Sequence, residues 1–381
     1  MSFMRDEIFE QPDIVARLAT DLATYRGAVA GARRAGVRFV LYAARGTSDN
    51  AAVYGKYLAT IHAGLPAGLA VPSSATVYDT PVDLRECLVV GISQSGETPD
   101  VAEYVAHARG AGAFTLAITN DDDSLLARHA HAVLPTRAGH ERAVAATKTY
   151  TSQLAALALF WATWCDDAVL LAALRDDVPA AMRAALSLDG EVAAVAQWLR
   201  FSERLLVAAR GYNFATALET ALKLKETSYI AAMPYSAADL MHGPVAMVEP
   251  GYPALLFSLP GRALPAMRRL EGDLRRRGAE LVIVEAASGE GTSADGASAA
   301  AASGEGASGE AAEGVAAGEA EDRSRTDVAR GRSLRLPFVP AEPLSPLVAV
   351  VPGQLLAARL AEARGYDPDR PRGLHKVTKT L

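Results

Sequence analysis

Short β-rich segments alternate with longer helical segments along the whole chain, and this alternation limits the possible folds more than any other feature. The expected strands fall at residues 37–44, 88–92, 114–119 and 132–134, and again at 205–209, 254–258, 281–284 and 334–338. Segments between them, such as 99–109 and 149–164, carry apolar residues at helical spacing. Such alternation predicts an α/β fold in which helices cover both faces of a parallel sheet, a three-layer αβα sandwich.

Two distant segments resemble each other. VLYAARGTSDNAAVYGKYL at 40–58 and LLVAARGYNFATALETALKL at 205–224 both contain a strand, the sequence AARG, a short loop and an Ala-rich helix. We interpret this as a duplicated α/β unit. The expected domains are 1–175 and 190–381, joined by a helical connector near 166–197.

Composition and charge exclude several classes of protein. The 381 residues are 50% hydrophobic and carry a formal net charge of −6, so a basic nucleic-acid-binding surface is not expected. The two cysteines, Cys87 and Cys165, form no disulfide framework, and no Cys/His cluster has the spacing of metal ligands. The acidic start lacks a signal peptide, and the apolar run at 154–165 is shorter than the roughly 18 residues of a membrane span. We therefore expect a cytoplasmic protein that needs no metal and contacts no membrane.

One segment interrupts the pattern. Residues 286–325 consist almost wholly of Ala, Gly, Ser, Glu and Asp. They have too little apolar surface to offset the entropy lost on ordering. We predict a disordered surface insertion without a catalytic role.

The sequence GISQSGETPD at 91–100 follows a strand and opens a helix, with Thr98 expected at the N-cap and Pro99 at the first helical position. The loop offers the side chains of Ser93, Gln94, Ser95 and Thr98, together with backbone N–H groups, at the positive end of a helix. Many neutral donors in that place suit a phosphate monoester. Capping of the helix by these hydroxyls is the simpler alternative.

A second strand-to-helix turn carries Arg45, Gly46, Thr47 and Ser48. Its two hydroxyls are candidates for contacts with sugar hydroxyls or phosphate. Simple N-capping is an equally good interpretation of these hydroxyls.

Five motifs in a fixed order resemble one family. They are SQSGET at 93–98, AVAATKTYTSQL at 143–154, ALETALKLKETSYI at 217–230, HGP at 242–244 and GLHKVTKTL at 373–381. Together with EIFEQP at 7–12, they resemble the isomerase half of glucosamine-6-phosphate synthases and, more closely, the free-standing glucosamine-6-phosphate deaminases of the sugar-isomerase (SIS) family. The resemblance implies two tandem SIS domains. No glutamine-hydrolysing segment precedes the motifs and residue 2 is Ser, so we expect no release of ammonia from glutamine.

The resemblance also implies roles for single residues. Glu226 matches the general base that moves a proton between C2 and C1 of the open-chain sugar, and Lys223 matches a lysine near the developing enediol. An ion pair between the two on a solvated helix face is the alternative. His242 matches the histidine that opens the pyranose ring, and it belongs to the site of a neighbouring subunit in the family. Lys376 matches a lysine that forms a Schiff base in the synthase and that in a deaminase serves only to close the tail over the sugar. Ala146 stands where the synthase has a serine.

The function that the resemblance implies is the cofactor-free conversion of glucosamine 6-phosphate to fructose 6-phosphate and ammonia by a homodimer. Another SIS isomerase, a deglycase or an N-acetylhexosamine-6-phosphate dehydratase would use the same base. A sugar-phosphate-sensing module is an alternative of a different class. The sequence does not distinguish the hexosamine epimers, acetylated from free amines, or the physiological direction.

Overall fold

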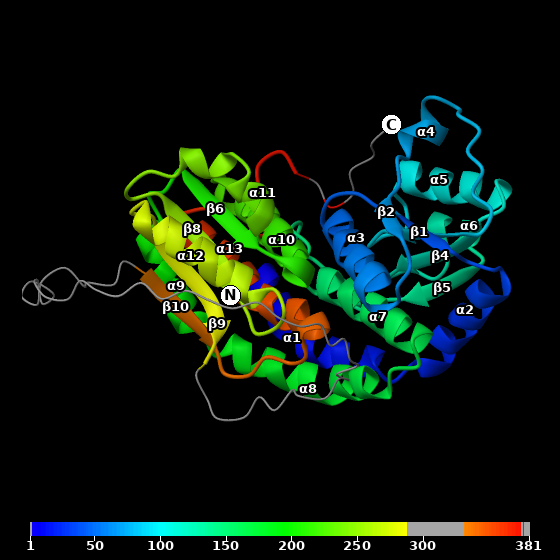
Figure 1. Cartoon of the computed structure of the whole chain (residues 1–381), viewed down its shortest axis with the longest axis horizontal. Helices are drawn as coiled ribbons and strands as arrows, with labels where there is room; N and C mark the ends of the chain where they lie inside the picture. Colours follow the sequence, from blue (N-terminus) through cyan, green and yellow to red (C-terminus); the bar gives the residue numbers. More distant parts are fainter. Residues whose placement is uncertain (1, 288–330, 375, 377–381) are drawn as a thin grey trace, which may run out of the picture. The chain divides into compact units, whose positions relative to one another are not determined.

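Two five-stranded parallel sheets form the frame of the protein (Figure 1). The computed structural model describes residues 2–287, 331–374 and 376. The first sheet has the order β2-β1-β3-β4-β5, with strands β1 (Phe39–Ala43), β2 (Ala67–Leu69), β3 (Cys87–Ile92), β4 (Phe114–Thr119) and β5 (Ala132–Pro135). The second has the order β10-β9-β8-β6-β7, with strands β6 (Arg204–Ala209), β7 (Ala231–Ser236), β8 (Pro253–Ser258), β9 (Glu280–Ala286) and β10 (Gly331–Leu336).

Helices connect and cover the strands. The longer ones are α1 (Phe3–Leu18), α2 (Leu22–Arg34), α3 (Thr47–Tyr57), α5 (Pro99–Gly110), α7 (Lys148–Trp164), α8 (Ala168–Leu186), α9 (Asp189–Leu199), α10 (Phe214–Ser228), α12 (Leu264–Arg276) and α13 (Ser345–Ala363). The short ones are α4 (Ser73–Thr76), α6 (Leu125–His129), α11 (Ala237–Met241), the π-helical turn η1 (Leu58–His62) and the 3-10 turns η2 (Gly211–Asn213), η3 (Pro244–Met247) and η4 (Glu342–Leu344).

Both faces of each sheet are covered, which confirms the predicted αβα architecture. In the first sheet, alternate side chains of β3 pack against α5 and α6 on one face and against the core that contains α2, α3 and α7 on the other. In the second sheet, one face packs against α11 and α12 and the other against α10 and α13. A continuous apolar core joins the helices on the inner faces of both sheets.

The two halves have the same topology. Counted along the chain, each sheet has its strands in the order 2-1-3-4-5, and all neighbours are parallel. This identity supports the duplication inferred from the sequence. In a sheet of this order, ligands bind beyond the carboxyl ends of the first and third strands, where the direction of strand addition reverses. The protein therefore has two such positions, one beyond β1 and β3 and one beyond β6 and β8.

Two strands were not predicted, and both lie at a sheet edge. β2 is three residues long and contains Gly68, and β7 contains Pro234 in its interior. Glycine and proline are unfavourable in a central strand, because they weaken it or remove a donor, but an edge strand tolerates them. The other eight strands agree with the expected segments within a few residues.

α8 and α9 occupy the segment expected to connect the two units. Extensive contacts join the described residues of both halves into one compact unit. One of these contacts links α1 to α13, where Gln11 Nε2 donates to Gln354 Oε1 at 2.6 Å. The boundaries 1–175 and 190–381 stay a prediction, and most of the expected insertion lies outside the described residues.

In the part of the chain that the structure describes, one helical stretch is long and apolar enough to cross a membrane. It is Glu342–Ala363, and 94% of its most apolar window is buried inside the protein. This burial is typical of a core helix. Its middle approaches α10 so closely that a Cβ atom on Gly353 would lie 2.2 Å from Thr220 Oγ1.

Candidate active site

A cavity of about 150 Å³ lies beyond the carboxyl ends of β1 and β3, at the first of the two expected positions. All seven predicted binding residues and Lys376 line it. The full lining is Arg45, Thr47, Ser48, Ile92, Ser93, Gln94, Ser95, Thr98, Ala146, Thr149, Gln153 and Lys376. We call this the first cavity.

The hydroxyl groups of the loop between β3 and α5 form hydrogen bonds within the loop, with one another and with its backbone N–H groups. Thr98 is the N-cap residue of α5 and Pro99 its first residue, as predicted, but the Thr98 side chain makes no capping hydrogen bond. Its Oγ1 lies 2.9 Å from Ser93 Oγ, which also accepts from the backbone N–H of Gly96 at 3.1 Å. Ser95 Oγ accepts from the N–H of Glu97 at 3.2 Å. The simpler interpretation, that these hydroxyls cap the helix, is therefore wrong for Thr98.

Thr47 and Ser48 also do not cap their helix, because α3 begins with Gly46 at the N-cap and has no side-chain cap. Ser48 Oγ accepts from Gln153 Nε2 at 2.9 Å. Thr47 Oγ1 donates to Glu219 Oε1 at 3.2 Å and accepts from Lys223 Nζ at 3.1 Å. Thr47 thus joins the first cavity to α10.

α10 carries the predicted base and lysine beside this contact. Lys223 Nζ lies 2.5 Å from Glu226 Oε2. The ion pair that we considered as the alternative exists, but it does not lie on a solvated face, because the exposed fraction of the Lys223 side chain is 1% and that of Glu226 is 23%. Glu226 and Lys223 are not part of the cavity wall itself; Lys223 reaches the wall through Thr47.

Sequence reasoning missed Glu219. Its carboxylate is fully buried, lies 3.7 Å from Lys223 Nζ and accepts from Asn50 Nδ2 at 2.8 Å. Burial raises the pKa of Glu219 to about 7, although Lys223, Asn50 and Thr47 act in the opposite direction. Burial alone would lower the pKa of Lys223, but Glu219 and Glu226 raise it. The spacing of Glu219, Lys223 and Glu226 by four and then three residues was the available signal, because it places all three on one helix face.

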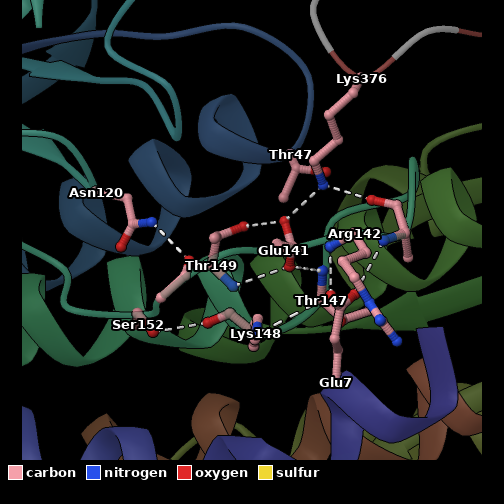
Figure 2. Close-up of polar contacts among 12 residues, drawn as sticks. Glu7, Thr47, Asn120, Glu141, Arg142, Thr147, Lys148, Thr149, Ser152 and Lys376 are labelled. Atoms are coloured by element: carbon pink, nitrogen blue, oxygen red, sulfur yellow. Dashed lines mark hydrogen bonds and ion pairs between the residues drawn. The ribbon is translucent and has the colours of Figure 1, made fainter. Parts of the chain in front are cut away.

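Glu141 is a second missed residue, and it holds the end of the chain. Figure 2 shows its buried carboxylate accepting from the backbone N–H groups of Thr147 at 2.8 Å and Thr149 at 3.2 Å, and from Thr149 Oγ1 at 2.7 Å. Lys376 Nζ donates to the same carboxylate at 3.0 Å and to the carbonyl oxygen of Ala143. Lys376 therefore closes one side of the first cavity with its amine already bound by acceptors.

Glu7 of α1 holds the loop before α7 in place through hydrogen bonds (Figure 2). Glu7 accepts from the backbone N–H of Arg142 and from that of Ala143 at 3.2 Å. Burial raises the pKa of Glu7. The buried Lys148 pairs with Glu10 at 2.7 Å. The motif EIFEQP thus positions the motif AVAATKT through contacts between residues 136 and 138 positions apart in sequence.

His242 does not lie at the first cavity of its own chain. It follows α11, is exposed to solvent and is not among the residues that line the first cavity. Its assignment as the ring-opening group stays a prediction.

Replacement of Glu219 by Gln should change how stability depends on pH. The folded-state pKa of about 7 lies above the ordinary value of 4.5, so the stability that this group contributes is complete below pH 4.5 and is lost as the pH rises through 7. A glutamine does not titrate. The free energy of unfolding of Glu219→Gln minus that of the wild type should therefore increase between pH 5 and 7, by at most about 1.4 kcal/mol per pH unit.

Urea unfolding at pH 5, 6, 7 and 8 measures this difference. Glu103→Gln, which changes an exposed carboxylate on α5, is the matched control and should show no such trend. A difference that stays constant over this range for Glu219→Gln would mean that Glu219 ionises like an ordinary exposed acid.

Comparison with known proteins agrees with the two sheets of the fold. The sequence matches the model of the SIS domain over residues 36–162 and 199–299. A glutamine–fructose-6-phosphate aminotransferase (isomerizing) from Aquifex aeolicus is 32% identical over 376 residues, which are 98% of this chain and 57% of that protein. The chain thus spans little more than half the length of the curated relatives that it matches.

Two solved structures extend the comparison to the fold. A "putative phosphosugar isomerase" from Silicibacter pomeroyi has a TM-score of 0.79 at 30% identity, with 97% of this chain and 100% of that chain covered. The C-terminal domain of glucosamine-fructose-6-phosphate aminotransferase from Francisella tularensis has a TM-score of 0.80 at 26% identity, with 97% and 98% covered. From the matched segments on both of its sheets, the chain belongs to the SIS domain family.

Proposed function

We propose that this protein is a sugar-phosphate isomerase of the SIS type whose reaction is the deamination of glucosamine 6-phosphate. The observation that carries the proposal is the position of Lys223 Nζ, which contacts both Glu226 Oε2 at 2.5 Å and Thr47 Oγ1 at 3.1 Å. A carboxylate and a cation thus lie next to a cavity lined with hydroxyl and amide groups, which suit a phosphate. A base and a cation in such a place suit proton transfer between C1 and C2 of a sugar phosphate.

The reaction follows from these groups. After ring opening, Glu226 removes the C2 proton of the aldehyde form, and Lys223 stabilises the negative charge that develops on O1. Return of the proton to C1, with transfer of a second proton from the amine nitrogen to O1, gives a C1 hydroxyl group and an imine at C2. Addition of water to this imine and loss of ammonia leave fructose 6-phosphate, so one water is consumed and one ammonia is released.

The position of Lys376 favours deamination over transfer of nitrogen to the ketose. Its amine is bound by Glu141 and by the carbonyl oxygen of Ala143, and does not extend free into the first cavity. A lysine held in this way supports closure of the tail over the sugar better than attack on a carbonyl. In deamination the substrate brings its own nitrogen, so such an attack is not needed.

The exposed position of His242, outside the first cavity, supports its action in the site of a second subunit. The proposed enzyme is therefore at least a dimer, in which His242 of one chain serves the Glu226 of the other.

The direct test is incubation of the protein with a panel of hexosamine 6-phosphates, with ammonia and ketose phosphate measured separately. Glucosamine 6-phosphate should give both products in equal amounts. Formation of a ketose without ammonia from a plain aldose phosphate would indicate an isomerase. Loss of water from an N-acetylated substrate would indicate a dehydratase. Either result without deamination would contradict the proposal.

Removal of two loop hydroxyls should weaken substrate binding far more than folding. Neither Ser95 nor Thr98 caps α5 through its side chain, so Ser95→Ala with Thr98→Ala should raise KM at least about tenfold while Tm changes by only a few degrees. Steady-state kinetics and thermal unfolding of the same preparation measure the two effects. An unchanged KM in the folded double variant would show that this loop does not bind phosphate.

Subunit exchange tests the roles of Glu226 and His242 together. Glu226→Gln and His242→Asn should each be nearly inactive. After mixing under conditions that exchange subunits, hybrids with one intact site should restore about a quarter of wild-type activity if exchange is statistical. Failure to recover activity despite demonstrated exchange would mean that the two residues do not complete each other's site.

A further inference from the structure

A second cavity, of about 500 Å³, lies beyond the carboxyl ends of β6 and β8. Its wall includes Arg210 and Gly211 after β6, Ser236 at the end of β7 and Arg262 after β8. Because the two sheets have the same strand order, this is the position that corresponds to the first cavity. Arg210 and Gly211 are the counterparts of Arg45 and Gly46 in the repeated AARG sequence.

Three cationic side chains line this second cavity. Arg210, Arg262 and Lys56 line it, and in the described part of the chain none of them has an ion-pair partner. The contrast is with Arg45, whose guanidinium pairs with Asp100 at 2.5 Å. The carboxylates of Asp239 and Glu342 also line the cavity, so three cations face two acids and the excess is a single positive charge. Arginine is the residue best suited to bind a phosphate group through two parallel hydrogen bonds.

The side-chain carboxylate of Glu342 accepts hydrogen bonds from the backbone N–H groups just before α12. Glu342 accepts from the N–H groups of Arg262 at 2.8 Å and Ala263 at 3.1 Å. It lies so close to Gly261 that a Cβ atom there would be 2.2 Å from the Glu342 carboxyl carbon. In the first sheet, the corresponding loop is the phosphate-binding loop before α5. A ligand phosphate in the second cavity must therefore bind to the three cations, beside Glu342.

The rest of the wall suits a sugar. The rings of Tyr57 and Tyr212 both line the cavity, with their centroids 6.2 Å apart. The volume lies within the range of small-molecule sites, which combine aromatic surfaces with a few polar groups.

The second cavity lacks the catalytic groups of the first. Alignment of the two AARG sequences places Leu58 opposite Lys223 and Ile61 opposite Glu226. Ile61 lines the second cavity, so an apolar side chain stands where the base would be. A ligand bound here would not be converted.

We propose that the second cavity is a non-catalytic binding site for a sugar monophosphate, whose phosphate is held by Arg210, Arg262 and Lys56. The ligand class rests on the proposed function of the first cavity, whereas the anion site rests on the charges alone. Two helices connect the cavities. α3 begins at Thr47 in the first and reaches Lys56 in the second, and α10 begins beside the second and carries Lys223, which contacts Thr47 of the first.

Calorimetric titration of the full chain carrying Glu226→Gln, which prevents turnover, tests the proposal. Glucosamine 6-phosphate should bind with two equivalents per chain. Adding Arg210→Ala and Arg262→Ala should weaken one equivalent at least tenfold and leave the other, whereas adding Ser95→Ala and Thr98→Ala should weaken the other. Arg269→Ala, which removes an exposed arginine on α12 away from the cavity, is the matched control and should leave both equivalents.

The outcomes separate the two proposals. A single equivalent that is lost in the loop variant and insensitive to the arginine variant would overturn the second site and leave the proposed function intact. No binding at all would overturn both. Competition experiments test whether the second cavity recognises the sugar as well as the phosphate. Inorganic phosphate should displace the second equivalent at least tenfold less well than fructose 6-phosphate. Equal displacement by the two would overturn a sugar phosphate as the ligand. Thermal unfolding of each variant establishes that it is folded.

Discussion

The candidate active site depends on the contacts of the buried Lys223 ammonium group with its neighbouring carboxylates and with Thr47. The ammonium group lies within 4 Å of two carboxylates of its own helix, Glu219 and Glu226, and bonds to Thr47 at the start of α3. A buried lysine without such partners would be strongly destabilising, because desolvation of a charge must be offset by opposite charge and hydrogen bonds. The contacts with Thr47 that help to stabilise the buried charge also hold α10 against the start of α3, next to the first sheet. They also hold the proposed base near the loop that is proposed to bind phosphate.

This arrangement explains why both halves are needed for one site. The first sheet supplies the loop donors around Ser93 and Thr98, and the second supplies α10. A further layer of carboxylates, Glu7 and Glu141, holds the loop before α7 and the tail at Lys376. If the duplication produced two equivalent cavities, they have since diverged: one gained charges from α10, and the other has apolar Ile61 in the wall and Glu342 on its helix donors.

The sequence predicted the fold class and eight of the ten strands in the described part of the chain, because these depend on local patterns. The seven residues expected to bind phosphate or sugar all line the first cavity, and their binding stays a prediction. Periodicity, glycine-rich turns and strand ends are written in neighbouring residues. It did not predict β2 and β7, whose Gly68 and Pro234 contradict strand propensity at positions where only an edge makes them acceptable. It also missed Glu219, because its partners Thr47 and Asn50 are 172 and 169 residues away and only the folded chain brings them together.

We propose that Glu226 of α10 acts as a base on a sugar held in the first cavity. Exchange of the C2 proton of glucosamine 6-phosphate with D2O, followed by proton NMR, tests it most directly, because the exchange needs only the base and the bound open-chain sugar. The account predicts that the wild type exchanges this proton and that Glu226→Gln binds the sugar with similar affinity but exchanges at least about a hundredfold more slowly. Undiminished exchange in the Glu226→Gln variant would contradict the account.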